Sequence, residues 1–168
     1  MSRPAHARAM ALAAALCAAL SVAACSNDKD LADASAFGAN GGAARPGSPQ
    51  DFVVNVGDRV FFESDSSDLT PTATATLDKQ ASWLQRYPRY TFLIEGHADE
   101  RGTREYNFSL GARRAQAVND YLASRGIAAS RIRTVSYGKE RPVAVCNDIS
   151  CWSQNRRAVS VLDGGAGS

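Results

Sequence analysis

One acidic and one basic residue stand out as a pair that could bind a charged ligand. Asp99 follows the apolar run Tyr90–Ile94, and Arg114 lies downstream in a long amphipathic stretch. Charged groups therefore gather where a strand should end and a helix begin, a common ligand-binding edge in proteins built from sheets and helices. A fixed carboxylate and a fixed guanidinium together would suit a ligand that carries both an ammonium and a carboxylate group.

The same residues allow plainer interpretations. Asp99 and Arg114 could form a salt bridge with each other, which at a surface would contribute only about 0–1 kcal/mol. His97, beside Asp99 and Glu100, hints at metal binding or acid–base chemistry. That hint is weak, because the only other histidine, His6, falls in a segment that we expect to be removed. The sequence therefore predicts no metal site, no cofactor and no catalytic residue.

The first 24 residues are typical of a secretory signal peptide. Arg3 and Arg8 supply the positive start, and an Ala- and Leu-rich apolar run follows that is too short to span a bilayer comfortably. Residues 22–25, VAAC, are similar to a bacterial lipobox, which implies cleavage before Cys25 and lipid modification of its side chain. A plain secretory signal with an incidental cysteine is the alternative.

The residues after the cysteine indicate how the protein is held. Ser26 favours the outer membrane, since lipoproteins kept in the inner membrane often have Asp there; we expect a lipid anchor on the periplasmic face. Residues 25–50 contain almost no large apolar side chains, so they should form a disordered tether. The expected organisation is a signal peptide (1–24), the lipidated Cys25 and tether (25–50), a folded domain (51–163) and a flexible tail (164–168).

Net charge argues against a polyanionic partner. The whole chain carries a formal charge of +2, and loss of the leader removes Arg3 and Arg8, which leaves basic and acidic side chains equal in number. Proteins that bind nucleic acid usually carry a basic excess. We therefore expect no nucleic acid partner, and we do not interpret the neighbours Arg156 and Arg157 as a phosphate-binding patch.

Two cysteines remain once the leader is removed and the lipobox cysteine is set aside. Cys146 and Cys151 have four residues between them, in a chain exported to an oxidising compartment, so a local disulfide is expected. A metal pair is the alternative, but no second Cys/His pair completes a site. Closing so short a loop removes little entropy from the unfolded chain, so the bond should shape the loop more than hold the fold. Trp152, directly after Cys151, fits a partner surface or local packing equally well.

The pattern of residues 51–163 predicts an α+β domain. Thr70 followed by Pro71 fits the start of a helix, and Thr103 can cap a second one. Trp83 should pack in the core, and Arg157 should point out of the last strand. The expected strands are 53–56, 59–62, 90–95, 132–137 and 156–162; the helices end near Tyr87 and just before Gly126. This order predicts a two-layer sandwich with the helices on one face of a mixed sheet.

Four segments in order resemble the OmpA-like peptidoglycan-binding domain. They are 96–102 (GHADERG), 106–115 (YNFSLGARRA), 135–140 (VSYGKE) and 153–159 (SQNRRAV). The resemblance covers residues from about 52 to 163. It implies a non-covalent grip on meso-diaminopimelate in the stem peptides of the cell wall, and partnership with TolB and the other Tol system proteins of the envelope.

The resemblance also assigns residues. Asp99 matches the acidic residue that binds the diaminopimelate ammonium, and Arg114 matches the arginine that binds its carboxylate. Asn107 and Leu110 fall on the peptide-facing side of the same helix, and the spacing of three and then four residues puts both on one face with Arg114. The predicted function is a lipoprotein that links the outer membrane to peptidoglycan and supports envelope integrity and cell division.

Two other functions remain open from the sequence. A hydrolase acting on peptidoglycan is suggested by His97, Asp99 and Glu100, although the expectation is that the protein is not an enzyme. A protein-interaction module for TolB, with incidental wall binding, is the other alternative. The resemblance suggests that TolB and the wall use overlapping surface around residues 99–114.

Overall fold

The structure, a computed structural model, describes residues 44–163. The expected signal peptide, the lipid attachment at Cys25, the tether up to residue 43 and the tail 164–168 lie outside this range. Within residues 44–163, no helix is both long and apolar enough to cross a membrane.

The described chain alternates strands and helices. Helix α2 (Pro49–Asp51) continues into a π-helical turn, η2 (Phe52–Val56). The later elements are β1 (Arg59–Phe61), α3 (Pro71–Arg86), β2 (Thr91–His97), α4 (Arg104–Ser124), the 3-10 turn η3 (Ala129–Arg131), β3 (Ile132–Gly138), α5 (Ile149–Asn155) and β4 (Arg157–Asp163).

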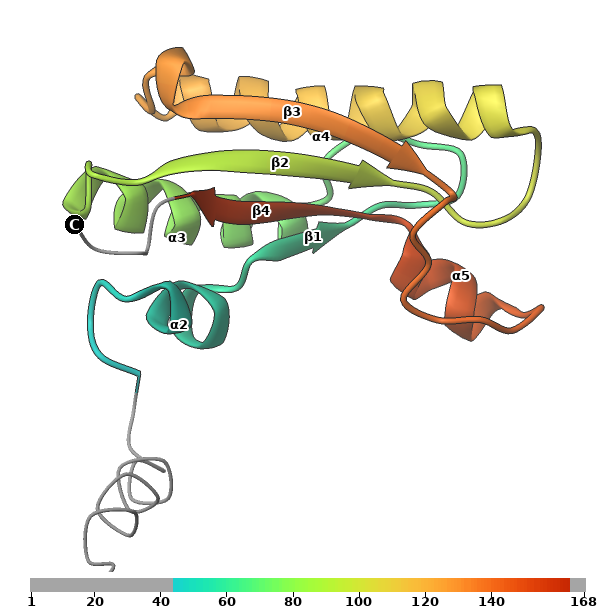
Figure 1. Ribbon diagram of the computed structural model, residues 1–168, viewed down its shortest axis with the longest axis horizontal. Coiled ribbons are helices and arrows are strands. Elements are labelled where there is room, and N and C mark those ends of the chain that lie inside the picture. The colour runs from blue at the N-terminus through green and yellow to red at the C-terminus, as the bar shows by residue number, and fades with distance from the viewer. Residues whose placement is uncertain (1–43, 164–168) are drawn as a thin grey trace, which may run out of the picture. The chain divides into compact units, whose positions relative to one another are not determined.

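The four strands form one mixed sheet in the order β1-β4-β2-β3. Strand β4 runs antiparallel to both β1 and β2, while β2 and β3 are parallel. The long helices α3 and α4 pack against the sheet to form the second layer (Figure 1). The predicted α+β two-layer fold with a mixed sheet is confirmed.

Both long helices begin as the sequence predicts. The Thr70 hydroxyl accepts a hydrogen bond from the Ala73 amide at 3.1 Å, and the Thr103 hydroxyl accepts one from the Tyr106 amide at 3.2 Å. Such caps satisfy amides that have no partner within the helix. They fix the residue at which α4 starts, and hence which of its side chains face the sheet.

The core lies between the sheet and the two helices. Trp83 is buried there, as predicted, with its ring centroid 5.0 Å from that of Phe52 and 4.7 Å from that of Tyr87. Its indole N–H donates to the Asp51 carboxylate at 2.8 Å, so this large side chain has its polar atom satisfied. The remaining core is mainly aliphatic and includes Leu77, Leu84, Phe92, Ile94, Val118 and Leu122.

The first predicted strand, 53–56, is wrong. Residues 52–56 form a π-helical turn that buries Phe52 and leaves Val54 61% exposed. Ser48 caps the preceding turn, and the Asp51 carboxylate accepts hydrogen bonds from the Gly47 amide and from Trp83. The Trp83 hydrogen bond ties the segment to α3, and the local contacts stabilise a helical backbone ahead of the β-branched residues. Helical structure is therefore present at Pro49 and Gln50, inside the segment 25–50 that the sequence predicts as tether.

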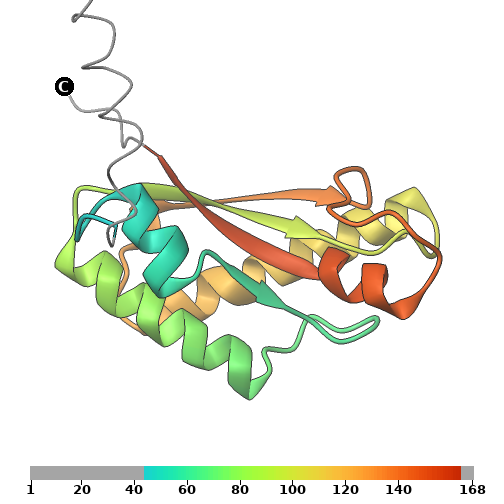
Figure 2. The ribbon, with the colours of Figure 1, turned by 90° about the horizontal axis from the view of Figure 1, so that it is seen from below.

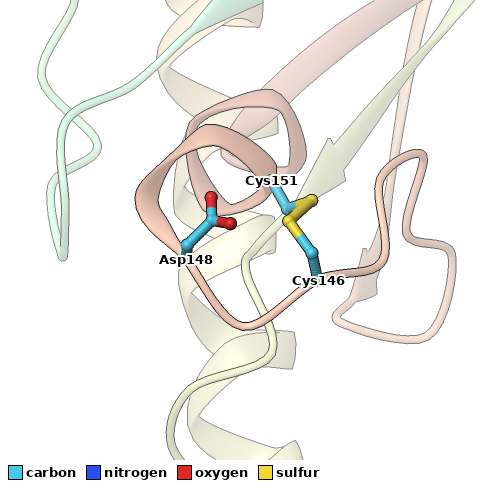
Figure 3. A group of neighbouring side chains, drawn as sticks. All are labelled: Cys146, Asp148 and Cys151. Atoms are coloured by element: carbon cyan, nitrogen blue, oxygen red, sulfur yellow. A yellow bond between two sulfur atoms is a disulfide. The ribbon is translucent and has the colours of Figure 1, made fainter.

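The loop before the last strand contains a helix that the sequence did not predict. Helix α5 is capped by Asp148, whose carboxylate accepts from the Ser150 amide at 2.8 Å. Cys146 and Cys151 are joined in a disulfide with their Cα atoms 5.7 Å apart (Figure 3). Figure 2 shows α5 at the same end of the sheet as the loop from β2 to α4. The disulfide-closed helix thus lies beside the predicted site.

Two glycines bring α4 very close to the sheet. A Cβ atom built on Gly96 of β2 would lie 1.8 Å from the carbonyl oxygen of Gly111. One built on Gly111 would lie 2.4 Å from the Ser136 hydroxyl and 2.8 Å from the Gly96 carbonyl oxygen. Only residues without a side chain permit this approach. It determines where the first half of α4 sits relative to the end of β2.

Candidate functional site

The four residues predicted to bind the ligand gather at one end of the domain. Asp99 follows β2 directly, and Asn107, Leu110 and Arg114 lie on the inward face of the first half of α4. All four are buried; Asp99 is 7% exposed and Arg114 is 0% exposed. The structure therefore brings the predicted residues together, beneath rather than on the surface.

Arg114 is held by backbone carbonyl groups. Its guanidinium donates to the carbonyl oxygens of His97 at 2.8 Å, Ser66 at 2.8 Å and Glu63 at 3.1 Å. Burial, and next the nearby charge of Arg156, lower its pKa to about 10, so it remains charged at neutral pH. The side chain thus joins the end of β2 to the loop between β1 and α3.

Asp99 is held by two other arginines. Arg101 donates from Nη2 to Oδ2 at 2.7 Å and from Nε to Oδ1 at 3.1 Å, and its amide also donates to Oδ1 at 3.2 Å. Arg156 Nη1 lies 3.4 Å from Oδ2. Among the described residues these are the ion pairs of Asp99, so the salt bridge with Arg114 that the sequence left open is not formed.

These partners control the charge of the Asp99 carboxylate. Burial raises the pKa of Asp99, but the hydrogen bonds and charge of Arg101, with the hydrogen bond from Arg156, outweigh it and hold the pKa below its usual value. Asp99 is therefore ionised at neutral pH in a largely dry position. An ammonium group could bind it strongly, provided that it displaces Arg101.

The loop between β2 and α4 is braced from both sides. The Asn107 side-chain amide donates to the Arg101 carbonyl at 2.7 Å. From the other side the Lys139 ammonium donates to the carbonyl oxygens of Glu100 at 3.2 Å and Gly102 at 2.6 Å. Asn107 accordingly supports the loop that carries Asp99, in addition to any contact with a ligand.

The sequence did not predict that Arg101 and Arg156 pair with Asp99, or that Trp152 lies against Arg101. Arg156 is buried and donates from Nε to the Phe62 carbonyl at 3.0 Å, and its neighbour Arg157 is also buried, contrary to the outward direction predicted for Arg157. The Trp152 ring centroid lies 4.3 Å from the Arg101 guanidinium carbon. The segment 153–159 that carries the resemblance already contained Arg156, which was the available signal.

His97 does not take part in this cluster through its side chain. Both ring nitrogens are buried without a hydrogen bond, although Nε2 lies 3.5 Å from a Glu95 carboxylate oxygen. Burial, and then the charges of Arg157 and Arg141, lower its pKa to about 4, so the ring is neutral at pH 7. His97 and Glu95 therefore do not form an ion pair at neutral pH.

The described residues contain one group that resembles a metal-ligand set. It consists of Cys146, Asp148 and Cys151 in the loop that enters α5 (Figure 3). The two sulfur atoms are bonded to each other, so neither is available as the thiolate that zinc requires. The geometry agrees with the disulfide interpretation of the pair.

The sequence matches the OmpA family over residues 61–156. It is 64% identical to the peptidoglycan-associated lipoprotein of Rhizobium meliloti over 92% of this chain and 88% of that protein. The chain belongs to the OmpA family, among the peptidoglycan-associated lipoproteins. The lipoprotein of the same name from Pseudomonas aeruginosa is 46% identical over 72% of this chain and 71% of its own length.

Solved structures agree with this family assignment. The crystal structure of the peptidoglycan-associated lipoprotein from Burkholderia pseudomallei is 38% identical, with a TM-score of 0.65, covering 69% of this chain and 100% of that one. The C-terminal domain of Helicobacter pylori MotB is 22% identical with a TM-score of 0.61, over 65% of this chain and 86% of its own, and shows the common fold. The resemblance stated from the four sequence segments is confirmed.

Proposed function

We propose that this lipoprotein binds peptidoglycan through Asp99 and Arg114, which hold the ammonium and the carboxylate of one amino-acid centre of meso-diaminopimelate. The observation that carries this proposal is that an ionised Asp99 and a charged Arg114 occupy the same end of the domain, beside Asn107 and Leu110. The names of the relatives support a wall ligand. Leu110 would contact the apolar part of the stem peptide.

Binding requires the site to open. Arg114 is enclosed by the loop between β1 and α3, whose Glu63 and Ser66 carbonyl oxygens occupy two of its donors. A ligand carboxylate would replace these neutral acceptors with a charged one, which makes a stronger hydrogen bond. The loop residues Glu63 and Asp65 are exposed, so the loop can move outward without uncovering a large apolar area.

The path of the chain suits a link between two layers of the envelope. Helix α2, near the start of the described chain, lies at one end of the sheet, and the loop from β2 to α4 lies at the other (Figure 1). The described chain therefore starts near the end of the sheet opposite to the loop that carries Asp99. This supports the proposed role as a non-enzymatic connection between the outer membrane and the wall.

A second candidate function is interaction with the Tol system. Next to the site, the outer face of α4 exposes Tyr106 and Phe108, the latter at 57%. Exposed aromatic side chains are common at protein interfaces. We propose that TolB contacts this end of the domain and competes with the wall, which would connect wall binding to cell division. Simultaneous binding of TolB and a stem peptide with unchanged affinities would refute the competition.

Retention on purified sacculi tests the proposal. The variant Asp99→Asn removes the charge and keeps the shape, and we expect it to lose most of its retention. Arg114→Lys keeps the charge but removes the planar fork, and should weaken retention. Alanine at position 114 is a poor test, because it would leave three carbonyl groups without their donor and destabilise the fold. Circular dichroism should accompany each measurement, and release of soluble muropeptides would support the hydrolase instead.

A further inference from the structure

The Asp99 carboxylate, which we propose binds the ligand, already forms an ion pair with Arg101. Arg101 bonds both oxygens of Asp99 in a two-pronged arrangement, and its Nη2 also donates to the Ser64 hydroxyl at 2.8 Å. The arginine side chain remains 44% exposed, so it can leave toward solvent. Arg101 therefore occupies the position that a ligand ammonium would need, and binding becomes an exchange of one cation for another.

Trp152 of helix α5 packs against the Arg101 side chain. The Trp152 ring covers the Arg101 guanidinium at 4.3 Å, and the Trp152 indole N–H donates to the Glu100 carboxylate, which orients the ring. A cation over an indole face is attracted by the negative charge of that face. Trp152 thus stabilises the arrangement in which Arg101 lies between the ring and Asp99.

The position of Trp152 depends on how α5 is tied down. The disulfide holds the first turn of the helix through Cys151. Its other end is held separately, because the Asn155 side chain accepts from the amides of Val143 and Ala144 and donates to the Ala144 carbonyl. Loss of the disulfide should therefore loosen the turn that carries Trp152 while the last turn keeps its contacts.

We propose that Trp152 is a positioning residue that sets the affinity of the wall site. Arg101 acts as an internal competitor for Asp99, and the disulfide-closed helix α5 keeps that competitor in place. This inference rests on the proposed function, because it concerns the same Asp99 site. On this proposal, the disulfide between Cys146 and Cys151 affects ligand affinity as well as the shape of its loop.

Titration of a tripeptide, L-Ala–γ-D-Glu–meso-diaminopimelate, into the folded domain tests the idea by calorimetry. Because a partly exposed cation–π contact corresponds to a modest free energy, we expect Trp152→Ala to lower Kd about two- to fivefold. Arg101→Gln should lower it at least as much, and the double variant Cys146→Ser/Cys151→Ser should lower it to a smaller degree. Trp152→Phe, which keeps an aromatic face, should lie between Trp152→Ala and the unmodified protein.

A control variant separates positioning from general stability. Ile149 lies on the same helix and is 63% exposed, so Ile149→Ala should leave Kd unchanged. A second readout needs no ligand: the Arg101 Nε–H should exchange with solvent faster in Trp152→Ala than in the unmodified protein, because it donates to Asp99 only while Arg101 is held.

The outcomes are distinguishable. Tighter binding with faster Arg101 exchange supports the inference. Unchanged or weaker binding of Trp152→Ala, with the unmodified protein binding normally, overturns the inference and leaves the proposed function standing. No binding by the unmodified protein overturns the proposed function, and the inference with it.

Discussion

Because α4 lies very close to the sheet, we predict that Gly111→Ala lowers the free energy of unfolding. Helix propensity alone would predict the opposite change. In an exposed helix, changing Gly to Ala stabilises by about 1 kcal/mol. At Gly111 the added methyl group would lie 2.4 Å from the Ser136 hydroxyl and 2.8 Å from the Gly96 carbonyl oxygen. The hydroxyl can rotate, although it would give up its 2.7 Å hydrogen bond to the Phe108 carbonyl. The Gly96 carbonyl belongs to a central strand and cannot move alone.

The size of the effect follows from these terms. Overpacking that shifts backbone costs about 1–3 kcal/mol, and the lost Ser136 hydrogen bond adds about 1 kcal/mol. Propensity offsets about 1 kcal/mol. We expect Gly111→Ala to lower the free energy of unfolding by about 1–3 kcal/mol, which corresponds to a fall in Tm of roughly 4–12 °C for a domain of this size.

Thermal and urea unfolding by circular dichroism measure this change. Ala112 is adjacent and exposed, so Ala112→Gly is the matched control and should lose about 1 kcal/mol through propensity alone. Because α4 also carries Arg114, Gly111→Ala should weaken wall binding. A Gly111→Ala domain as stable as the unmodified one, or more stable, would refute the close approach of α4 to β2.

Three further predictions concern stability. Burial lowers the pKa of His97 to about 4 in the native state, whereas the unfolded chain binds that proton below about pH 6.5. The free energy of unfolding should therefore be unaffected by His97 above pH 6.5 and should fall by about 3 kcal/mol as the pH drops toward 4. Urea unfolding of the unmodified protein and of His97→Phe between pH 7 and 4.5 should show this loss only in the former. The variant Cys146→Ser/Cys151→Ser should lose about 2 kcal/mol or less, measured by Tm, because the closed loop is short. Thr103→Ala should lose about 1 kcal/mol through the missing cap, measured by urea unfolding.

Each of these has a result that would contradict it. Parallel pH profiles for His97→Phe and the unmodified protein would show that His97 titrates normally in the native state. Failure of the cysteine double variant to fold would mean that the disulfide holds the whole domain. An unchanged stability of Thr103→Ala would mean that water replaces the cap at no cost.

Local signals predicted much of the fold. Thr70 and Thr103 are predictable as caps, because a hydroxyl before a helical pattern satisfies specific amides. The β-branched residues of segment 53–56 favour a strand, whereas contacts of Asp51 with Gly47 and Trp83 stabilise a helical turn. The contact with Trp83 joins residues 32 positions apart in sequence, so no local pattern contains it.

The sequence motifs propose which residues form the candidate site, but they carry no information on the contacts around those residues. Motif positions placed Asp99 and Arg114 at one end of the domain. They could not show that Arg114 donates to three backbone carbonyl groups, since carbonyl oxygens carry no sequence signal. The role of Trp152 was equally hidden, because it depends on helix α5 bringing its ring over Arg101.

The most direct test of wall binding compares the unmodified domain with Asp99→Asn in a titration followed by NMR. The ligand is the meso-diaminopimelate tripeptide, and the same peptide with L-Lys in place of diaminopimelate lacks the second carboxylate. The account predicts shifts for the Arg114 guanidinium and for residues 63–68 with the first peptide, and strongly reduced binding for Asp99→Asn and for the L-Lys peptide. Equal binding of both peptides by both proteins, or shifts confined to residues remote from Asp99 and Arg114, would contradict it.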